Sequence, residues 1–386
     1  MKKSTGFTIV ELLVVIVVIG ILAAITIVSY VGITNKAKTT AAQSNASAVQ
    51  SVVETFNAEN GIYPDQLSSF TSASNTAKLP SSVVLLTSGQ TLSSANGQNS
   101  ILYKYDGSVG ASTGGTISYW DFTTNLVSTN VIHIGTGLGT NFLINLSDNL
   151  AAYYKLDENN GNAADSIGSS ALTNANSVTY SNVSGKINNH SLLIAASSQY
   201  LYTPDNSRLS ITGSQSYSFW IKMTSQPLTN VGMILFAKSF GAISNRSVEA
   251  YYSDIASVKK IQFQWFLDGT NSNYQSVAWN QTLTTGSWYY LTFVLNPTNG
   301  TATQAEVYVN GLSIGNGTNS TGGTGATSVY DSTADFVIGQ QDHNHLLAGY
   351  YLDARVDEFG IWSRTLSAAD VARLYNSGNG LSYTSF

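Results

Sequence analysis

The hydrophobic pattern begins with one long apolar run, from Phe7 to Val31. A helix rises about 1.5 Å per residue, so a run of this length is sufficient to cross the roughly 30 Å hydrocarbon core of a membrane. Beyond it, apolar residues repeat at the i, i+3, i+4, i+7 spacing of one helix face. These residues are Val49, Val52, Val53 and Phe56. Because Asn60-Gly61 is a stop signal, we predict one helix over 7–59, with 7–31 as its transmembrane part.

Shorter apolar runs, separated by Gly, Ser and Thr, fill the next part of the chain. Three of them have the length and composition of β-strands: ILYKYDG (101–107), GTISYWDF (115–122) and NVIHIG (130–135). We therefore predict a small α+β head over 60–135, in which the end of the helix packs on an antiparallel sheet. The glycines of GTGLGT (135–140) precede no Lys-Ser/Thr pair and open no helix, so we interpret 136–148 as a linker.

A period of two dominates the rest of the chain, 149–386. In YSFWIKM (217–223) and WYYLTFVL (288–295), large apolar residues occupy alternate positions on one face. Such alternation in many short runs is typical of an all-β antiparallel sandwich of two sheets, the jelly-roll class. Asn310-Gly311 predicts a hairpin turn. Near the end, Ser367 and Asp370 form the capping pair of a short helix, and Gly378 is its expected stop.

Composition and charge narrow the partners. Only 10% of the residues are charged and the formal net charge is −5, so a nucleic acid is not an expected partner. The chain has no cysteine, which excludes disulfides and thiolate metal sites. With 43% hydrophobic and 11% aromatic residues, the chain has enough apolar surface to fill a core.

Glu11 is the one charge inside the apolar run. A lone carboxylate at membrane depth costs roughly 3 kcal/mol, so a plain membrane anchor leaves this residue unexplained. A secretory signal peptide would have a shorter apolar core followed by a small-residue cleavage site, which SYVGITNK does not provide. Neither of these two interpretations explains Glu11.

The stretch KKSTGFTIVELLVVIVVIGILAA resembles the leader and first helix of type IV pilins and pseudopilins. The resemblance implies that residues 1–6 are a leader, that a prepilin peptidase cuts after Gly6, and that the new terminus at Phe7 is methylated. It also implies that Glu11 meets the amine of Phe7 on a neighbouring subunit during assembly. The expected location is the bacterial cytoplasmic membrane (single-pass) and then the cell surface or pilus, with other pilin subunits as partners.

The phrases YYKLDENNGNAADSIG (153–168), FVIGQQD (336–342) and VDEFGIWSRTLSAADVARLYNSG (356–378) resemble laminin-G-like and pentraxin-like lectin domains of the concanavalin A-like group. The resemblance covers most of the predicted domain over 149–386. It implies a domain that binds glycans or protein surfaces, often with Ca²⁺, and usually without catalysis.

The same resemblance implies where Ca²⁺ and a glycan would bind. In the loop IGQQDHNHLL, Gln341 would offer its backbone carbonyl and Asp342 its carboxylate, with Asn245 as the match in the partner loop. An alternative is a structural clamp of Asp157, Asp165 and Asp357, and a third interpretation treats these carboxylates as ordinary turn acceptors. Two further expectations concern neighbouring side chains. His343 and His345 alternate but lack a third metal ligand, and Tyr350 and Tyr351 are candidates for stacking on a sugar.

Catalysis is not expected. Glycoside hydrolases need two carboxylates facing each other across the sugar, and enzymes of this fold place them in alternation on one strand. Here the pairs Asp157-Glu158 and Asp357-Glu358 are adjacent, so each pair is expected to point to opposite faces. We predict a minor pilin or pseudopilin, of a type IV pilus-like or type II secretion-like system, that presents a lectin-like domain for adhesion. The alternatives are a membrane-anchored surface adhesin that does not polymerise and a pilin-displayed glycoside hydrolase.

Overall fold

The computed structural model divides the chain into two compact units, Met1–Asn145 and Leu146–Phe386, which are described separately. The structure describes residues 9–383 except 72–75, 77, 88–89, 109, 137–138, 140, 143–145, 169, 196–197, 241–244, 298–304, 322–327 and 343–349.

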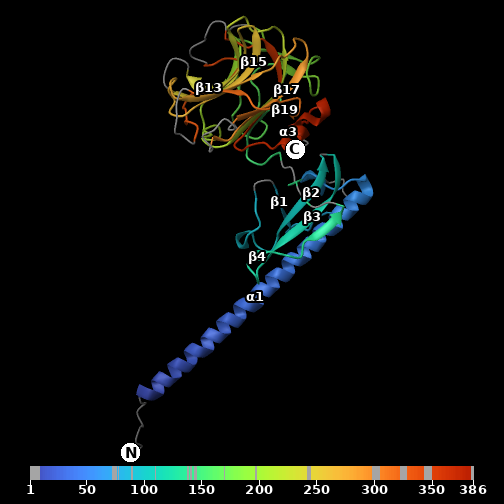
Figure 1. Cartoon of the computed structure of the whole chain (residues 1–386), viewed down its shortest axis with the longest axis vertical. Coiled ribbons are helices and arrows are strands. Elements are labelled where there is room, and N and C mark those ends of the chain that lie inside the picture. The colour runs from blue at the N-terminus through green and yellow to red at the C-terminus, as the bar shows by residue number, and fades with distance from the viewer. Residues whose placement is uncertain are drawn as a thin grey trace, which may run out of the picture. The chain divides into compact units, whose positions relative to one another are not determined.

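The first unit is organised by one long helix, α1 (Ile9–Asn60), shown in blue in Figure 1. It ends where the sequence predicts, and Gly61 follows with a φ of 73° that favours glycine. The buried side chains of α1 all belong to its C-terminal half and form one stripe. They are Ala42, Ala46, Val49, Val52 and Val53. Val49, Val52 and Val53 of the expected apolar stripe are therefore confirmed and pack on the sheet of this unit, whereas Phe56 is half-buried and not part of this core.

The head sheet follows the predicted strands closely. Its elements are α2 (Ser68–Thr71), β1 (Val84–Leu86), the 3-10 turn η1 (Ser94–Asn96), β2 (Ser100–Ser108), β3 (Ala111–Asp121), β4 (Leu126–Val127), β5 (Ile132–Gly135) and β6 (Asn141–Phe142). Strand β3 lies beside β2, β4 and β5 in antiparallel pairs. Ile101, Tyr103 and Ile117 face the helix stripe and are buried with it.

Two expectations about the head were wrong. Strand β1 pairs with β2 in parallel, Val84 opposite Ser100, so the sheet is mixed and not purely antiparallel. The stretch 136–148 is not all connecting chain, because β6 lies within it and pairs with β2, placing Phe142 opposite Lys104. Both differences arise from strand pairs whose members are separated in the sequence, and local composition does not reveal such pairs.

The second unit is a sandwich of two sheets, each of eight described strands (Figure 1). One sheet has the order β19-β18-β17-β12-β22-β10-β9, with β7 also paired to β22. Its strands are β7 (Leu150–Tyr154), β9 (Thr179–Ser181), β10 (Ser191–Ile194), β12 (Gln215–Met223), β17 (Trp288–Leu295), β18 (Ala305–Val309), β19 (Leu312–Ser313) and β22 (Ala354–Trp362).

The other sheet has the order β20-β16-β15-β14-β13-β21-β11-β8. Its strands are β8 (Thr173–Ala175), β11 (Tyr200–Thr203), β13 (Gly232–Phe240), β14 (Asn245–Ile255), β15 (Val258–Phe266), β16 (Tyr274–Asn280), β20 (Thr318–Thr321) and β21 (Phe336–Ile338). All the described strand pairs of both sheets are antiparallel.

The core between the sheets is built from the alternating positions that the sequence singles out. On β12, Tyr217, Phe219 and Ile221 are buried in it. Phe219 stacks on Phe359 of β22 with ring centroids 4.9 Å apart. The two-sheet antiparallel sandwich is thus confirmed.

The outer face of β12 is buried as well, which alternation alone does not predict. Trp220 points away from the core and is 2% exposed. The helix α3 (Ala368–Tyr375) covers it, with the Tyr375 ring 5.7 Å from the Trp220 ring. Ser367 and Asp370 form the predicted capping box of α3. The helix ends earlier than predicted, because Asn376 adopts the left-handed C-cap conformation and a 3-10 turn, η3 (Asn376–Gly378), follows.

The first and last strands of the sandwich are neighbours. β7 pairs with β22, and the Trp362 ring nitrogen donates a hydrogen bond of 2.7 Å to the Leu146 carbonyl. This pairing brings the start of the segment 153–168 beside the start of the segment 356–378. The carboxylates described below lie where these two segments meet.

Candidate functional site

The N-terminal segment presents an uncovered apolar surface. Gly6 and Phe7 lie outside the described residues, as does the side chain of Glu11, whose backbone is in α1. Along the first half of α1, Leu12, Ile16 and Ile19 are each more than 55% exposed. The helix has a mean hydropathy of 3.1 in its most apolar window and is long enough to cross a membrane.

Gln341 and Asp342 of the expected Ca²⁺ loop are both buried, at 5% and 2% exposure. The Gln341 side chain donates a hydrogen bond of 2.8 Å to Glu249 of β14. Glu249 also pairs with Arg246 at 3.0 Å and accepts a hydrogen bond from the Tyr251 hydroxyl. Burial raises the pKa of the Glu249 carboxyl, and Arg246 acts in the opposite direction. The Gln341 side chain is therefore held by a buried acid, Glu249, that we did not predict.

The other residues expected around this loop are placed differently. The Asn245 side chain holds Thr333, accepting from its N–H at 3.1 Å and donating to its hydroxyl at 3.0 Å, so its amide is used within the fold. Tyr350 is 38% exposed and Tyr351 is half-buried, at the end of the same loop. His343 and His345 lie outside the described residues.

Asp157, Asp357 and Glu358 come together where β7 and β22 meet. Asp357 and Glu358 are buried at 0% and 2% exposure, and the charge of Asp157 acts on both. The expectation that Asp357 and Glu358 point to opposite faces of a regular strand was wrong. Glu358 has a φ of 51°, and the pairing with β12 shifts register at this point, which marks a β-bulge.

The backbone at this cluster is strained at two positions, one just after β7 and one within β22. Leu156 has a φ of 59°, an uncommon value for a bulky residue, and it directly precedes Asp157. The Glu358 N–H donates to the Lys155 carbonyl at 3.4 Å, so the two strained positions lie across from each other. Asp357 and Glu358 are thus close enough to Asp157 to respond to its charge.

Burial disfavours the ionised forms of Asp357 and Glu358 and raises the pKa of both. The Asp357 carboxylate accepts hydrogen bonds from the N–H groups of Lys186 and Ile187, at 2.8 and 2.9 Å. Burial nevertheless outweighs them and raises the pKa of Asp357 well above its usual range. The pKa of Glu358 is raised to about 8: burial is the main cause and the charge of Asp157 adds to it, whereas the hydrogen bond of the Tyr153 hydroxyl and the charge of Lys155 act in the opposite direction.

Asp165 does not join the expected clamp. Its carboxylate accepts from the N–H groups of Tyr153 and Ile167, at 3.1 and 3.2 Å, and pairs with Arg208 at 3.6 Å. In the described part of the chain, no three His, Cys, Asp or Glu side chains are placed to hold a metal ion. The clamp of Asp157, Asp165 and Asp357 is therefore not assembled, and Asp165 serves as an acceptor for a turn.

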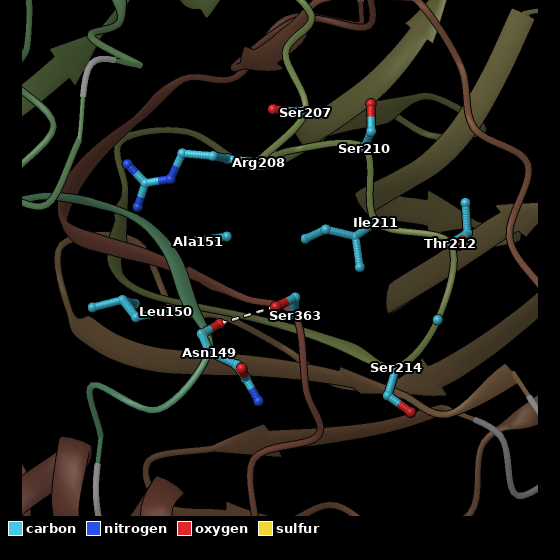
Figure 2. A pocket seen from close by; sticks show the side chains of 11 residues that line it. Asn149, Leu150, Ala151, Ser207, Arg208, Ser210, Ile211, Thr212, Ser214 and Ser363 are labelled. Carbon is cyan, nitrogen blue, oxygen red and sulfur yellow. Dashed lines mark hydrogen bonds between the residues drawn. The ribbon is translucent and has the colours of Figure 1, made fainter.

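A pocket of about 430 Å³ lies between the start of β7 and the loop joining β11 to β12 (Figure 2). Figure 2 shows the side chains of Ser207, Ser210, Thr212 and Ser214 along that loop. Some of the polar groups that line this pocket already make hydrogen bonds within the fold. Ser363 donates to the Asn149 carbonyl at 3.3 Å, and Arg208 donates to the Ile167 carbonyl at 3.3 Å.

A second pocket, of about 440 Å³, lies at the edge of the sandwich. We call it the edge pocket. Its lining residues are Asn159, Asn160, Gly161, Asn162, Asn174, Ser177, Val178, Thr179 and Tyr180. None of them was predicted as a site, although the Asn-rich phrase ENNGN in 158–162 was a signal that could have found it.

Comparison with known proteins assigns the two ends of the chain. Residues 1–27 match the prokaryotic N-terminal methylation motif, and residues 195–372 match the concanavalin A-like lectin/glucanases superfamily. The chain thus carries a type IV pilin-like methylation motif and a concanavalin A-like β-sandwich.

The curated relatives concern the N-terminal part alone. The type II secretion system core protein G of Vibrio cholerae is 34% identical over 64 residues, which is 17% of this chain and 44% of that protein. The core protein G of Pseudomonas aeruginosa is 32% identical over 63 residues, 16% of this chain and 44% of that protein. The chain therefore spans less than half the length of the curated relatives it matches.

Solved structures with similar sandwiches are distant. Domain 4 of an extracellular GH43 arabinanase from Geobacillus stearothermophilus, in complex with arabinotriose, is 20% identical with a TM-score of 0.39, covering 58% of this chain and 96% of that one. The binding domain of botulinum neurotoxin DC in complex with SialylT is 14% identical with a TM-score of 0.45, and the match covers 60% of this chain and 52% of that one. The fold assignment rests on the two sheets and on the family match.

Proposed function

We propose that the chain is a minor pilin or pseudopilin that presents a lectin-like domain for adhesion to a glycan or a surface. The observation that carries the proposal is the presence, in one chain, of an N-terminal methylation motif and a concanavalin A-like sandwich. The uncovered apolar half of α1 supports assembly, because such a surface is stable in a membrane or against neighbouring helices.

A minor subunit fits the size of the second unit. A compact unit of more than two hundred residues on every subunit would crowd a helical filament. The subunit would begin in the bacterial cytoplasmic membrane, meet a prepilin peptidase there, and join other pilin subunits on the way to the surface.

Binding without catalysis is the activity that the sandwich favours. A glycoside hydrolase needs a pair of carboxylates that a sugar can reach. Asp357 and Glu358 are almost completely shielded from solvent, and Glu249 is 0% exposed beneath Gln341. These acids are placed to stabilise or titrate within the fold and not to contact a substrate.

The test of this function is the mature N-terminus. In the host, mass spectrometry of sheared surface material is expected to give a chain that begins at Phe7 with a methylated amine. Deletion of the prepilin peptidase should leave the precursor in the membrane fraction. An intact Met1 or Lys2 terminus in the surface fraction would overturn the pilin assignment and favour a tethered adhesin that does not polymerise.

A second prediction concerns Ca²⁺ at the loop of Gln341 and Asp342. Ligand that binds only the folded state adds about 2.7 kcal/mol of stability at one hundred times its Kd, which corresponds to several degrees in Tm for a domain of this size. We expect this rise in Tm when millimolar Ca²⁺ is added to the full chain in detergent. Unfolding is monitored by tryptophan fluorescence. Asp342→Ala and Asp342→Asn should remove the Ca²⁺-dependent increment, whereas the exposed Asp331→Asn should retain it. Equal increments in all variants would move the Ca²⁺ site elsewhere.

A further inference from the structure

The edge pocket lies where the two sheets end. β8 is the last strand of one sheet and β9 the last strand of the other, and the short connection between them spans the gap. Loop 159–162 forms the opposite wall. At about 440 Å³ the pocket has the size of small-ligand sites in proteins.

The two walls of the edge pocket are fixed to each other by hydrogen bonds. The Asn174 side chain brackets the connection, accepting from the Val178 N–H at 2.8 Å and donating to the Val178 carbonyl at 2.9 Å. The Asn162 side chain accepts from the Asn174 N–H at 3.0 Å, and the Tyr180 hydroxyl donates to the Gly161 carbonyl at 3.2 Å. Because the walls are already fixed, binding of a ligand orders few additional groups and so loses little conformational entropy.

The lining has the chemistry of a site for hydroxyl groups. It contains no charged side chain, and its side-chain amides and hydroxyls each provide both donors and acceptors, as sugar hydroxyls require. Tyr180 adds a half-buried aromatic ring. Asn159, Asn160 and Thr179 are exposed at the mouth, where they can contact a ligand.

Charge around the pocket argues against an anionic ligand. The lining includes no Lys or Arg that would pair with a phosphate, sulfate or uronic acid. Glu158 directly precedes this lining, and its negative charge acts on Tyr180. An uncharged ligand avoids this repulsion.

We propose that the edge pocket is the glycan site of the domain and that it binds the end of an uncharged oligosaccharide. The inference rests on the proposed function, because it names the place and the ligand class of the adhesive activity. The Tyr180 ring packs against a sugar face, and the amides of loop 159–162 bond its hydroxyls.

The test measures binding of neutral trisaccharides to the full chain in detergent. The panel is maltotriose, cellotriose, mannotriose and arabinotriose, with trigalacturonic acid as the charged counterpart. The wild-type chain is expected to bind at least one neutral trisaccharide and to bind trigalacturonic acid at least roughly tenfold more weakly, a difference of about 1.4 kcal/mol.

Two substitutions at the mouth should abolish this binding without unfolding the domain. Thr179→Trp fills the entrance and Asn160→Ala removes a free amide; both positions are exposed, so the Tm should stay unchanged. Thr285→Trp, equally exposed and outside the pocket, is the matched control. Ser207→Trp blocks the pocket of Figure 2 instead and should leave binding intact.

The outcomes separate the site from the function. Binding that survives Thr179→Trp and Asn160→Ala overturns the edge pocket and leaves the adhesive function standing. Loss of binding in Ser207→Trp alone assigns the site to the other pocket. Preference for trigalacturonic acid overturns the ligand class. A wild-type chain that binds none of the panel overturns both this site and the glycan part of the proposed function, whereas processing after Gly6 is unaffected by any of these results.

Discussion

Glu11→Ala is expected to leave the chain in the membrane fraction and to lower its incorporation into sheared surface material by roughly tenfold or more. In the proposed assembly, Glu11 meets the methylated amine of Phe7 on a neighbouring subunit. Removing one partner of a buried ion pair costs about 3–5 kcal/mol, because the other charge is left buried without compensation. A loss of that size exceeds the 1.4 kcal/mol that corresponds to a factor of ten.

The same substitution should not impair membrane insertion. Replacing a carboxylate by a methyl group makes the run from Phe7 to Val31 more apolar, so insertion is favoured. Cleavage after Gly6 should also proceed, which separates an assembly defect from a processing defect. Immunoblots of the membrane and sheared fractions measure insertion and incorporation, and mass spectrometry of the N-terminus measures cleavage, so the three steps are followed independently.

Glu11→Asp is the control that keeps the charge. It is expected to restore a substantial part of the incorporation lost in Glu11→Ala, whereas Glu11→Gln, which keeps the size but not the charge, should not. Equal surface amounts of the wild type and Glu11→Ala would show that Glu11 is not the assembly contact.

The second large effect is a fall in the stability of the sandwich as the pH rises. Burial raises the pKa of Glu358 to about 8, against 4.5 for the exposed carboxyl of the unfolded chain. Between these values the folded domain keeps a proton that the unfolded chain releases. The stabilisation is therefore complete below pH 4.5 and is lost as the pH rises through 8, at about 1.4 kcal/mol per pH unit.

Asp357 adds to the same trend, because burial raises its pKa as well. From pH 5 to pH 8 we expect the Tm of the second unit to fall by roughly 10 °C. Tryptophan fluorescence of the full chain reports on this unit, because only Trp120 of the six tryptophans belongs to the first unit.

Glu358→Gln is the decisive variant for this prediction. Glutamine has the same shape and no proton to lose, so the pH profile should flatten and the Tm at pH 8 should exceed that of the wild type. Asp331→Asn removes an exposed carboxylate and should leave the profile unchanged. A wild-type Tm that is constant or rises from pH 5 to pH 8 would contradict the assignment of a protonated, buried Glu358.

Local patterns in the chain contain much of the fold. The stripe of Val49, Val52 and Val53 predicted the part of α1 that packs on the head, and the alternation of Tyr217, Phe219 and Ile221 predicted the core face of β12. Asn310 and Gly311 both have positive φ at the hairpin between β18 and β19, as expected. These features follow from neighbouring residues, so the sequence is sufficient to find them.

The surroundings of the candidate sites were not predicted, because each depends on residues far apart in the chain. Asn245, expected near the Ca²⁺ loop, holds Thr333, and Gln341 bonds to Glu249, a residue without any distinguishing motif. The edge pocket needs loop 159–162 and the β8–β9 connection at the same place, and spacing along the chain does not show that.

The sequence by itself determined the apolar run with its single carboxylate, the stripe that packs on the head, and a two-sheet sandwich with a capped C-terminal helix. Each of these features follows from the periodicity of the hydrophobic residues or from a short local motif. Only the tertiary structure decided that Asp157, Asp357 and Glu358 meet. That meeting depends on the pairing of β7 with β22 and on the positive φ of Leu156 and Glu358, which reverses the alternation at one residue. Register between distant strands is set by the whole core, and so no short stretch of sequence contains it.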